Sequence, residues 1–302
     1  MIGCFGKLPS SADFVSLHGA AEEVCEFDAW LQSSLAAMRH CDDWQALFDA
    51  LPVCFFNYRA RNGNWLPGGL LSSRDASQRR YPFFIFQLLK GEAGTALVNP
   101  YTLGELFSAQ IKPLLHQAVQ GAGSASLFER IKALRPLQGQ DLDLFRRVHT
   151  KFLHDYSLTD VARALHGSWP NFDSATALAQ LQISRAALHG DFAGGIELPL
   201  PAERGLKNPT ADLWLTWLTR MSRQPDVPAV SLLVDDFMHP RLYCFPSRHA
   251  NSAYRLLSEC ADTHQHLKLL NPLPGAPRQH NYDRPLEHVI DQFVDALDAT
   301  PV

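Results

Sequence analysis

The chain has 302 residues, of which 46% are hydrophobic and 19% are charged, and its formal net charge at pH 7 is −4. This composition is typical of a globular protein with a substantial core, and the slight excess of acidic residues gives no electrostatic argument for nucleic-acid binding. The sequence starts without the basic segment and long apolar core of a signal peptide, and its most apolar run is too short to cross a membrane. We therefore expect a cytoplasmic protein with no stable membrane insertion.

Six cysteines are spread along the chain: Cys4, Cys25, Cys41, Cys54, Cys244 and Cys260. They form no Cys-x-x-Cys pair, and most lie among apolar residues, so we expect free thiols in a reducing compartment rather than disulfides or metal ligands. His264 and His266 stand near Asp262, but side chains two apart on a helix do not face each other. The sequence therefore predicts no structural metal ion and no cofactor.

The first fifty residues predict a short strand, a polar loop and two helices, in that order. These segments cover residues 2–5, 6–15, 20–39 and 43–51. The first helix is amphipathic, and Asp42 or Asp43 is the expected N-cap of the second.

Residues 53–89 predict three neighbouring strands at the centre of a mostly antiparallel sheet. The segment 53–58 is apolar and aromatic, and the Asn62-Gly63 pair that follows it is a strong signal for a tight hairpin turn. The run Tyr81–Leu89 is rich in aromatic and branched side chains, which is typical of a strand buried on both faces.

The rest of the chain predicts a helical middle followed by a mixed α and β part. Thr102 is the expected cap of a helix that runs to residue 120, with a kink at Pro113. Further helices are expected at 125–135, 141–155, 173–189, 212–221, 252–261 and 285–297, strands at 195–200, 229–234 and 241–245, and an extended connection at 271–285.

The predicted fold class is therefore α+β: a central, mostly antiparallel sheet flanked by helices, with a helical middle segment and a C-terminal α+β part. We expect one domain over residues 1–122. Residues 123–302 either form a second unit or complete the same domain.

Catalytic signatures are mostly absent. The chain has no Gly-x-Ser-x-Gly elbow, no His-Glu-x-x-His zinc helix and no phosphate-binding loop. Asp235 and Asp236 follow a predicted strand, as the magnesium-binding acidic residues of nucleotide hydrolases do. Without a phosphate loop, a solvated strand end is the favoured interpretation.

Two polar loops lie directly beside buried strands: a first loop over residues 7–15 and a second over residues 72–82. Their candidate residues are Lys7, Ser10, Ser11 and Asp13 in the first, and Ser72, Ser73, Asp75, Arg79 and Arg80 in the second. One interpretation is turn and capping chemistry, in which Asp13 and Asp75 bind backbone amides and an arginine pairs with one of them. The other is a shared surface on which Arg79 or Arg80 receives an anionic group or an acidic partner. In both cases we expect the two loops to lie side by side at one end of the sheet.

The segment Gly6-Lys7-Leu8-Pro9-Ser10-x-x-Asp13-Phe14-Val15 resembles the opening signature of the TagF (ImpM) family, Gly-Lys-Leu-Pro-Ser-Arg-Gly-Asp-Phe-Val. Phe27-Asp28-x-Trp30 is similar to the tryptophan helix of that family, and Asp43-Trp44 to the tryptophan that follows it. The segment Gly69 through Phe83 resembles the family pattern Gly-x-x-x-Pro-Ser-x-Asp-x-x-Gly-Arg-x-x-Pro-Leu. The resemblance covers about residues 1–120.

This chain departs from the family pattern within both loops. Ser11 and Ala12 stand in place of Arg-Gly, Ser72 in place of a proline, and Gln78 in place of a glycine. Since glycine readily adopts a positive φ, the change at Gln78 raises the question of the loop's conformation.

The resemblance implies a non-enzymatic cytoplasmic regulator that represses type VI secretion after translation by binding a secretion component, such as the forkhead-associated scaffold protein. The residues expected to bind the partner are Lys7, Ser10, Asp13, Ser73, Asp75, Arg79 and Arg80. The competing hypothesis is a hydrolase or phosphotransfer accessory that uses Asp13, Asp75 and Arg79 for acid–base chemistry and anion binding. No nucleophile–base pair is evident for it in either loop.

Overall fold

The strands of the protein pair edge to edge in a single sheet. The computed structural model describes residues 1–91, 99–189, 192, 194–224, 227–248, 252–260, 266–269 and 282–299. Within these residues nine strands follow the order β2-β1-β5-β4-β3-β7-β8-β6-β9. They are β1 (Ile2–Gly6), β2 (Val15–Leu17), β3 (Cys54–Arg59), β4 (Trp65–Leu71), β5 (Phe83–Gln87), β6 (Gly195–Pro199), β7 (Val230–Val234), β8 (Arg241–Phe245) and β9 (His266–Lys268). Every neighbouring pair is antiparallel except β6 and β9, which are parallel.

The central strands confirm the prediction made for residues 53–89. β3, β4 and β5 are adjacent and antiparallel, and every residue of each is buried. Because successive side chains of a strand point to opposite faces, Phe83 and Ile85 join one hydrophobic cluster while Phe84 and Phe86 join the other. The sheet is thus covered by apolar side chains on both faces.

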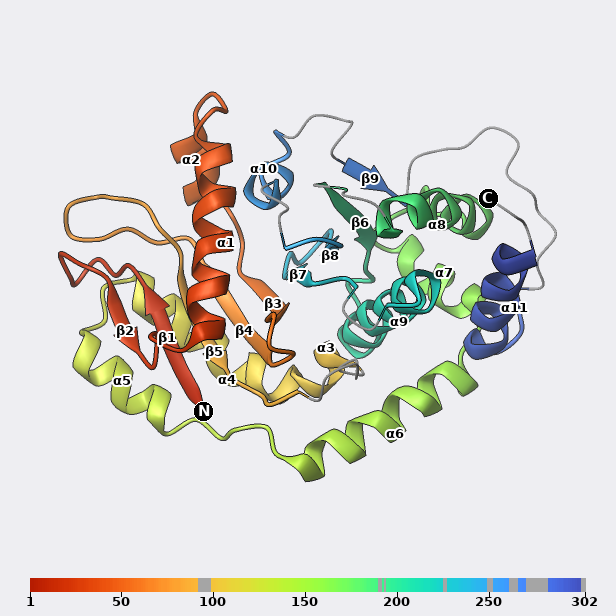
Figure 1. Ribbon diagram of the computed structural model, residues 1–302, viewed down its shortest axis with the longest axis horizontal. Coiled ribbons are helices and arrows are strands. Elements are labelled where there is room, and N and C mark those ends of the chain that lie inside the picture. The colour runs from red at the N-terminus through yellow and green to blue at the C-terminus, as the bar shows by residue number, and fades with distance from the viewer. Residues whose placement is uncertain are drawn as a thin grey trace.

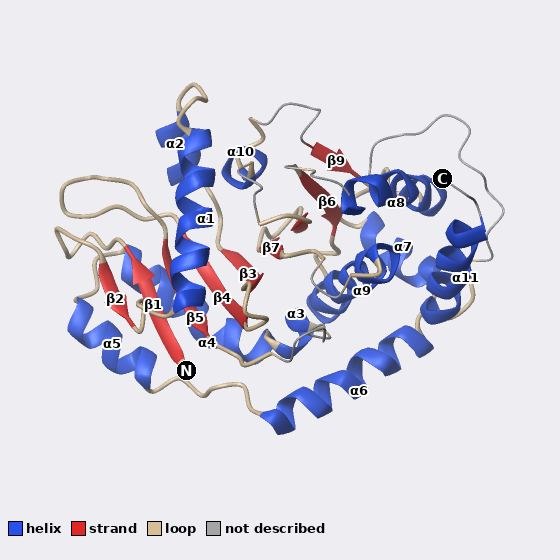
Figure 2. Cartoon of the chain, in the orientation of Figure 1, coloured by secondary structure: helices blue, strands red, loops and turns tan. Residues whose placement is uncertain are grey.

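Two layers of helices cover these two faces, as Figures 1 and 2 show. One layer contains α1 (Glu22–Met38), α2 (Trp44–Asp49) and α10 (Ala253–Leu257). The other contains α3 (Pro100–Leu103), α4 (Glu105–Val119), α5 (Ser124–Lys132), α6 (Gly139–Asp155), α7 (Leu158–His166), α8 (Ser174–His189), α9 (Arg204–Ser222) and α11 (Leu286–Ala299). The fold class predicted from the sequence is confirmed. No helix within the described residues is long and apolar enough to span a membrane.

The sheet runs without interruption from the N-terminal part of the chain to the C-terminal part. β3 pairs with β7 over five residue pairs, from Cys54 opposite Val234 to Tyr58 opposite Val230. A division of the chain near residue 122 therefore separates strands that belong to one sheet.

Several element boundaries differ from those predicted. The helix expected from Thr102 is two helices, α3 and α4, which Gly104 separates. Asp43 precedes α2 as expected but has a left-handed backbone and makes no capping hydrogen bond with its side chain. The sequence also missed β2, α7, β9 and the first two turns of α9. Most of the predicted connection at 271–285, together with Asp262 and His264, lies outside the described residues.

The N-terminus of α3 is capped from another part of the chain. The Asp212 carboxylate on α9 accepts hydrogen bonds from the backbone amides of Tyr101 (2.9 Å) and Thr102 (2.8 Å). The prediction that Thr102 caps this helix is therefore wrong: Thr102 lies inside it. The Tyr101 hydroxyl also donates to Ser231 on β7 at 2.8 Å, so α3 is fastened to two C-terminal elements.

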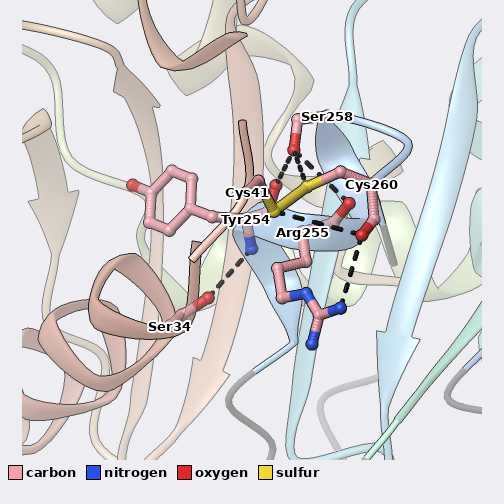
Figure 3. Close-up of a disulfide and its surroundings, with 6 residues drawn as sticks. All are labelled: Ser34, Cys41, Tyr254, Arg255, Ser258 and Cys260. Carbon is pink, nitrogen blue, oxygen red and sulfur yellow. Dashed lines mark hydrogen bonds between the residues drawn. A yellow bond between two sulfur atoms is a disulfide. The ribbon is translucent and has the colours of Figure 1, made fainter. Parts of the chain in front are cut away.

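A disulfide between Cys41 and Cys260 corrects the expectation that all six cysteines are free (Figure 3). Cys41 follows α1 and Cys260 follows α10, and these helices pack together, with the Tyr254 amide donating to Ser34 Oγ at 2.9 Å. The two cysteines are 219 positions apart, so the pairing depends on helix packing that no local spacing reveals. The free cysteines are Cys4, Cys25, Cys54 and Cys244, and all of them except Cys25 are buried.

Candidate functional site

The strand pairing places the two polar loops at the same end of the sheet. Gly6, the last residue of β1, pairs with Phe83, the first residue of β5, and Leu71 at the end of β4 pairs with the same Phe83. The first loop leaves the sheet after Gly6, and the second joins Leu71 to Phe83. Both loops therefore lie at the same end of the strands β1, β4 and β5.

Asp75 is the centre of the second loop, and its carboxylate is fully buried. One carboxylate oxygen, Oδ2, accepts hydrogen bonds from Lys7 Nζ at 2.9 Å and from Arg79 Nε at 2.7 Å. The other, Oδ1, accepts the backbone amides of Ser77 and Arg79, both at 2.9 Å. The Asp75 side chain thus binds a lysine of the first loop, and an arginine and two backbone amides of the second loop.

These contacts determine the charge of the carboxyl group. Burial alone raises the pKa of Asp75, but the hydrogen bonds from Lys7 and Arg79 outweigh it and hold that pKa well below its usual range. Asp75 is therefore a carboxylate at neutral pH, with its acceptor sites occupied.

Further hydrogen bonds cross directly from one loop to the other. Ser73 Oγ donates to the Lys7 carbonyl oxygen at 2.6 Å, and the Arg79 guanidinium donates to the Ala12 carbonyl oxygen at 2.6 Å. The prediction that the two loops lie side by side is confirmed. The local chemistry is the turn and capping chemistry of the first interpretation, with Arg79 as the arginine that pairs with an aspartate.

An aromatic ring lies in the middle of this surface. Phe14 is 41% exposed, although it stacks on Phe5 and meets Tyr81 edge to face, with ring centroids 5.2 and 5.1 Å apart. Lys7 Nζ lies 5.2 Å from the centre of the Phe14 ring, so the ring is held by a cation as well as by its aromatic neighbours. The site prediction left Phe14 out, and the signal that could have included it is an aromatic residue within an otherwise polar loop.

Of the remaining first-loop candidates, Asp13 and Ser10 are exposed and Ser11 is half-buried. Asp13 makes a local turn in which its Oδ1 accepts the Phe14 amide at 2.8 Å. Ser10 Oγ donates to the Ala122 carbonyl oxygen at 2.9 Å, between α4 and α5, and so anchors the loop to a helical neighbour. We call the exposed group Asp13, Phe14 and Arg79 the loop surface.

Arg80 does not join this group. It makes a two-pronged ion pair with Asp49 on α2, with nitrogen–oxygen distances of 2.9 and 2.7 Å. Arg79 and Arg80 are neighbours in the chain but bind carboxylates of different elements. Of the two arginines predicted, only Arg79 belongs to the loop surface, where 59% of its side chain is exposed.

The backbone of Gln78, which stands where the family pattern has a glycine, has a glycine-like conformation. Its φ is +64°, in the left-handed region that glycine adopts most easily. The loop therefore keeps a glycine-like backbone conformation with a glutamine side chain. The Gln78 amide donates to the Asp75 carbonyl oxygen at 2.9 Å and closes a turn, after which the chain continues directly into Arg79.

Asp235 is not the solvated strand end that the sequence suggested. Only 10% of its side chain is exposed, and its carboxylate binds Lys112 on α4 at 2.6 Å and also Lys207 on α9. These three residues line a cavity of about 350 Å³. The lysines are more than twenty residues away in sequence, so no local pattern could have paired them with Asp235. Asp236 does behave as predicted for a strand end, because it accepts the amides of the turn that follows.

The described residues contain no group of three or more His, Cys, Asp or Glu side chains placed to hold a metal ion. What the geometry defines is an α+β protein with one continuous sheet and an exposed aromatic and charged surface fastened to the end of its central strands.

Residues 3–134 match the family model of the TagF N-terminal domain, Type VI secretion system-associated. This part of the chain, which contains both loops, is therefore a TagF N-terminal domain, of the kind associated with type VI secretion systems.

Among solved structures, a match is the crystal structure of PA0076 from Pseudomonas aeruginosa PAO1, which is 24% identical with a TM-score of 0.38. The match covers 45% of this chain and 63% of that one. No curated protein matches the chain.

Proposed function

We propose that this chain represses type VI secretion after translation, by binding a secretion component through the loop surface. The forkhead-associated scaffold protein is the partner that the family resemblance implies. We also propose that the protein acts in the cytoplasm and that it does not catalyse a reaction.

The observation that carries the proposal is that the loop surface presents two exposed side chains, the Phe14 ring and Arg79. Aromatic and arginine side chains dominate the binding energy of protein interfaces. Both are held in place before any partner arrives: Phe14 by its ring contacts with Phe5 and Tyr81, and Arg79 by Asp75. A side chain that is already ordered loses little conformational entropy on binding, which favours recognition.

The same contacts weigh against the hydrolase or phosphotransfer alternative. A general base needs a free acceptor with a pKa near neutrality. Asp75 has a lowered pKa and accepts four hydrogen bonds from Lys7, Ser77 and Arg79. This supports a role in which Asp75 orders Arg79 and the partner is bound, not converted.

The proposal is tested by secretion and partner capture in a bacterium with type VI secretion whose own copy is deleted. Phe14→Ala should lose both repression and capture of the scaffold, because its side chain is exposed and supplies the apolar centre of the surface. Ile183→Ala is the matched control: this isoleucine is 50% exposed and lies on α8, a helix that packs against α9 and β9, at the other edge of the sheet from β1 and β2. Repression that survives Phe14→Ala combined with Arg79→Ala contradicts the proposed surface. Repression retained without any scaffold capture contradicts the proposed partner.

A further inference from the structure

A second cavity, of about 310 Å³, lies among the helices of the C-terminal part. It is bounded by the start of α3 and by α6, α9 and α11. In Figure 1, α6, α9 and α11 lie toward the right, whereas β1 and β2, which flank the first loop, lie toward the left. Its apolar walls include Pro100, Leu153 and Leu215. This size and lining are typical of a small-molecule site, in which a few polar groups set the orientation of a mostly apolar ligand.

His149 on α6 is the polar group that distinguishes this cavity. It lines the wall, and only 4% of its surface is exposed. Its Nε2 lies 3.0 Å from Thr216 Oγ1 on α9. Its other ring nitrogen, Nδ1, is buried and has no hydrogen-bond partner within the described residues. A buried polar atom without a partner is unfavourable, so a bound group that reaches Nδ1 and donates a hydrogen bond to it would be stabilised.

The neighbouring hydrogen bonds decide which ring nitrogen carries the proton. The Thr216 hydroxyl donates its single proton to the backbone carbonyl oxygen of Asp212, at 2.8 Å. Toward His149 it can then only accept, so Nε2 is the protonated nitrogen and Nδ1 is a lone-pair acceptor. Burial, with a smaller contribution from the charge of Arg220, lowers the pKa of His149 to about 4 and keeps the ring neutral at physiological pH.

The charged side chains around the cavity disfavour a negatively charged ligand. Arg220 on α9 lines the cavity, but its guanidinium is already engaged in an ion pair with Asp291 on α11. The carboxylate of Glu287, on the first turn of α11, lines the same cavity. With its cation paired and a further carboxylate present, the cavity disfavours a negatively charged ligand.

We propose that this cavity binds a small organic molecule that has an apolar body and an N–H or O–H donor for His149 Nδ1, and that carries no negative charge. Neutral hydroxyl compounds and amines meet these conditions, and an amine gains the additional attraction of Glu287. The site is distinct from the loop surface and does not depend on the repression proposed above.

Three probes of nearly equal size differ in their charge and in their hydrogen-bond donors: benzylamine, benzyl alcohol and benzoate. Each is added to the full-length chain with ¹⁵N-labelled histidine, and the Nδ1 resonance of His149 is followed at millimolar probe concentration. We expect benzyl alcohol and benzylamine to move this resonance, because an accepted hydrogen bond changes the shielding of an unprotonated nitrogen. Benzoate should leave it in place.

His149→Gln is the matching variant, since its side-chain amide can still donate toward Thr216 while the Nδ1 acceptor is removed. It should weaken benzyl alcohol binding about fivefold, the size of one hydrogen bond. His154→Gln, on the exposed side of the same helix, is the control and should change nothing. Glu287→Gln should weaken benzylamine but not benzyl alcohol, which keeps the test informative if the first variant folds poorly. An unmoved Nδ1 resonance with both donor probes, or benzoate binding as tightly as benzylamine, would overturn the proposal.

Discussion

The carboxylate of Asp212 binds the backbone amide of Tyr101, 111 positions earlier in the chain, at 2.9 Å. This contact joins α9 to the start of α3, and through it the C-terminal helices to the TagF-matching part of the chain. Asp212 is 1% exposed, and burial outweighs its hydrogen bonds and raises its pKa to about 7. Because folding raises the pKa of Asp212 so far, the free energy of unfolding should depend on pH.

Asp212→Asn tests that dependence. The folded protein holds the Asp212 proton up to about pH 7, whereas the unfolded chain releases it near pH 4, a typical value for aspartate. Between these values the folded state binds more protons, so this group's contribution to stability falls as the pH rises from about 4 to about 7. Asparagine does not titrate. The melting temperature of the wild type minus that of the variant should therefore decrease from pH 5 to pH 8.

His149 has the opposite effect, because its pKa is lowered to about 4 and stability rises with pH up to its usual range. Both proteins keep His149, so its effect cancels in the difference. Asp295→Asn, at an exposed position on α11, serves as the control. A melting difference for Asp212→Asn that does not change with pH contradicts the prediction.

Arg79→Ala is expected to abolish repression with little loss of stability. Its ion pair with Asp75 is largely exposed on the arginine side, and exposed pairs contribute little. Asp75 also keeps Lys7 as its partner. The melting temperature should fall by less than about 5 °C. Arg163→Ala, which removes a similarly exposed surface ion pair on α7, is the control for both assays. A larger fall in melting temperature would indicate that the role of Arg79 is mainly structural. Unchanged repression would show that Arg79 does not take part in binding at the loop surface.

Gln78→Gly should stabilise the protein. Residues other than glycine pay a conformational cost at positive φ, and the gain should be about 0.5–1 kcal/mol after the greater flexibility of glycine in the unfolded chain is subtracted. Denaturant unfolding measures it. Gln78→Ala is the matched control, because alanine keeps the Cβ that disfavours this conformation. Equal stability of the two variants would show that the backbone here is not strained.

The Cys41–Cys260 disulfide should stabilise the oxidised protein by about 2–4 kcal/mol, since it closes a long loop and restricts the unfolded chain. A reducing agent should lower the denaturation midpoint of the wild type but not of Cys41→Ser. Cys25→Ser, which removes an exposed free thiol, should respond to reduction as the wild type does. Non-reducing peptide mapping identifies the bond directly, and six titratable thiols in the oxidised, unfolded chain would contradict it.

The sequence by itself determined the central strands and the place of the two loops. A short continuous run of aromatic and branched side chains is a local property, so the buried strands around Phe55 and Ile85 could be predicted from their own residues. At Gln78 the sequence only raised the question of the loop conformation, and the structure answered it with a positive φ. The polar residues beside these strands then indicated which end of the sheet to consider.

Only the tertiary structure decided which partner each polar side chain has. Asp75 binds Lys7, Arg80 turns to Asp49, and Cys41 meets Cys260, although nothing near any of them in sequence distinguishes these partners from others of the same chemistry. Such pairs depend on strand register and helix packing, where a shift of one residue or one helical turn brings different side chains together. The exposure of the Phe14 ring and the missing partner of His149 Nδ1 were decided in the same way, by how distant parts of the chain pack around them.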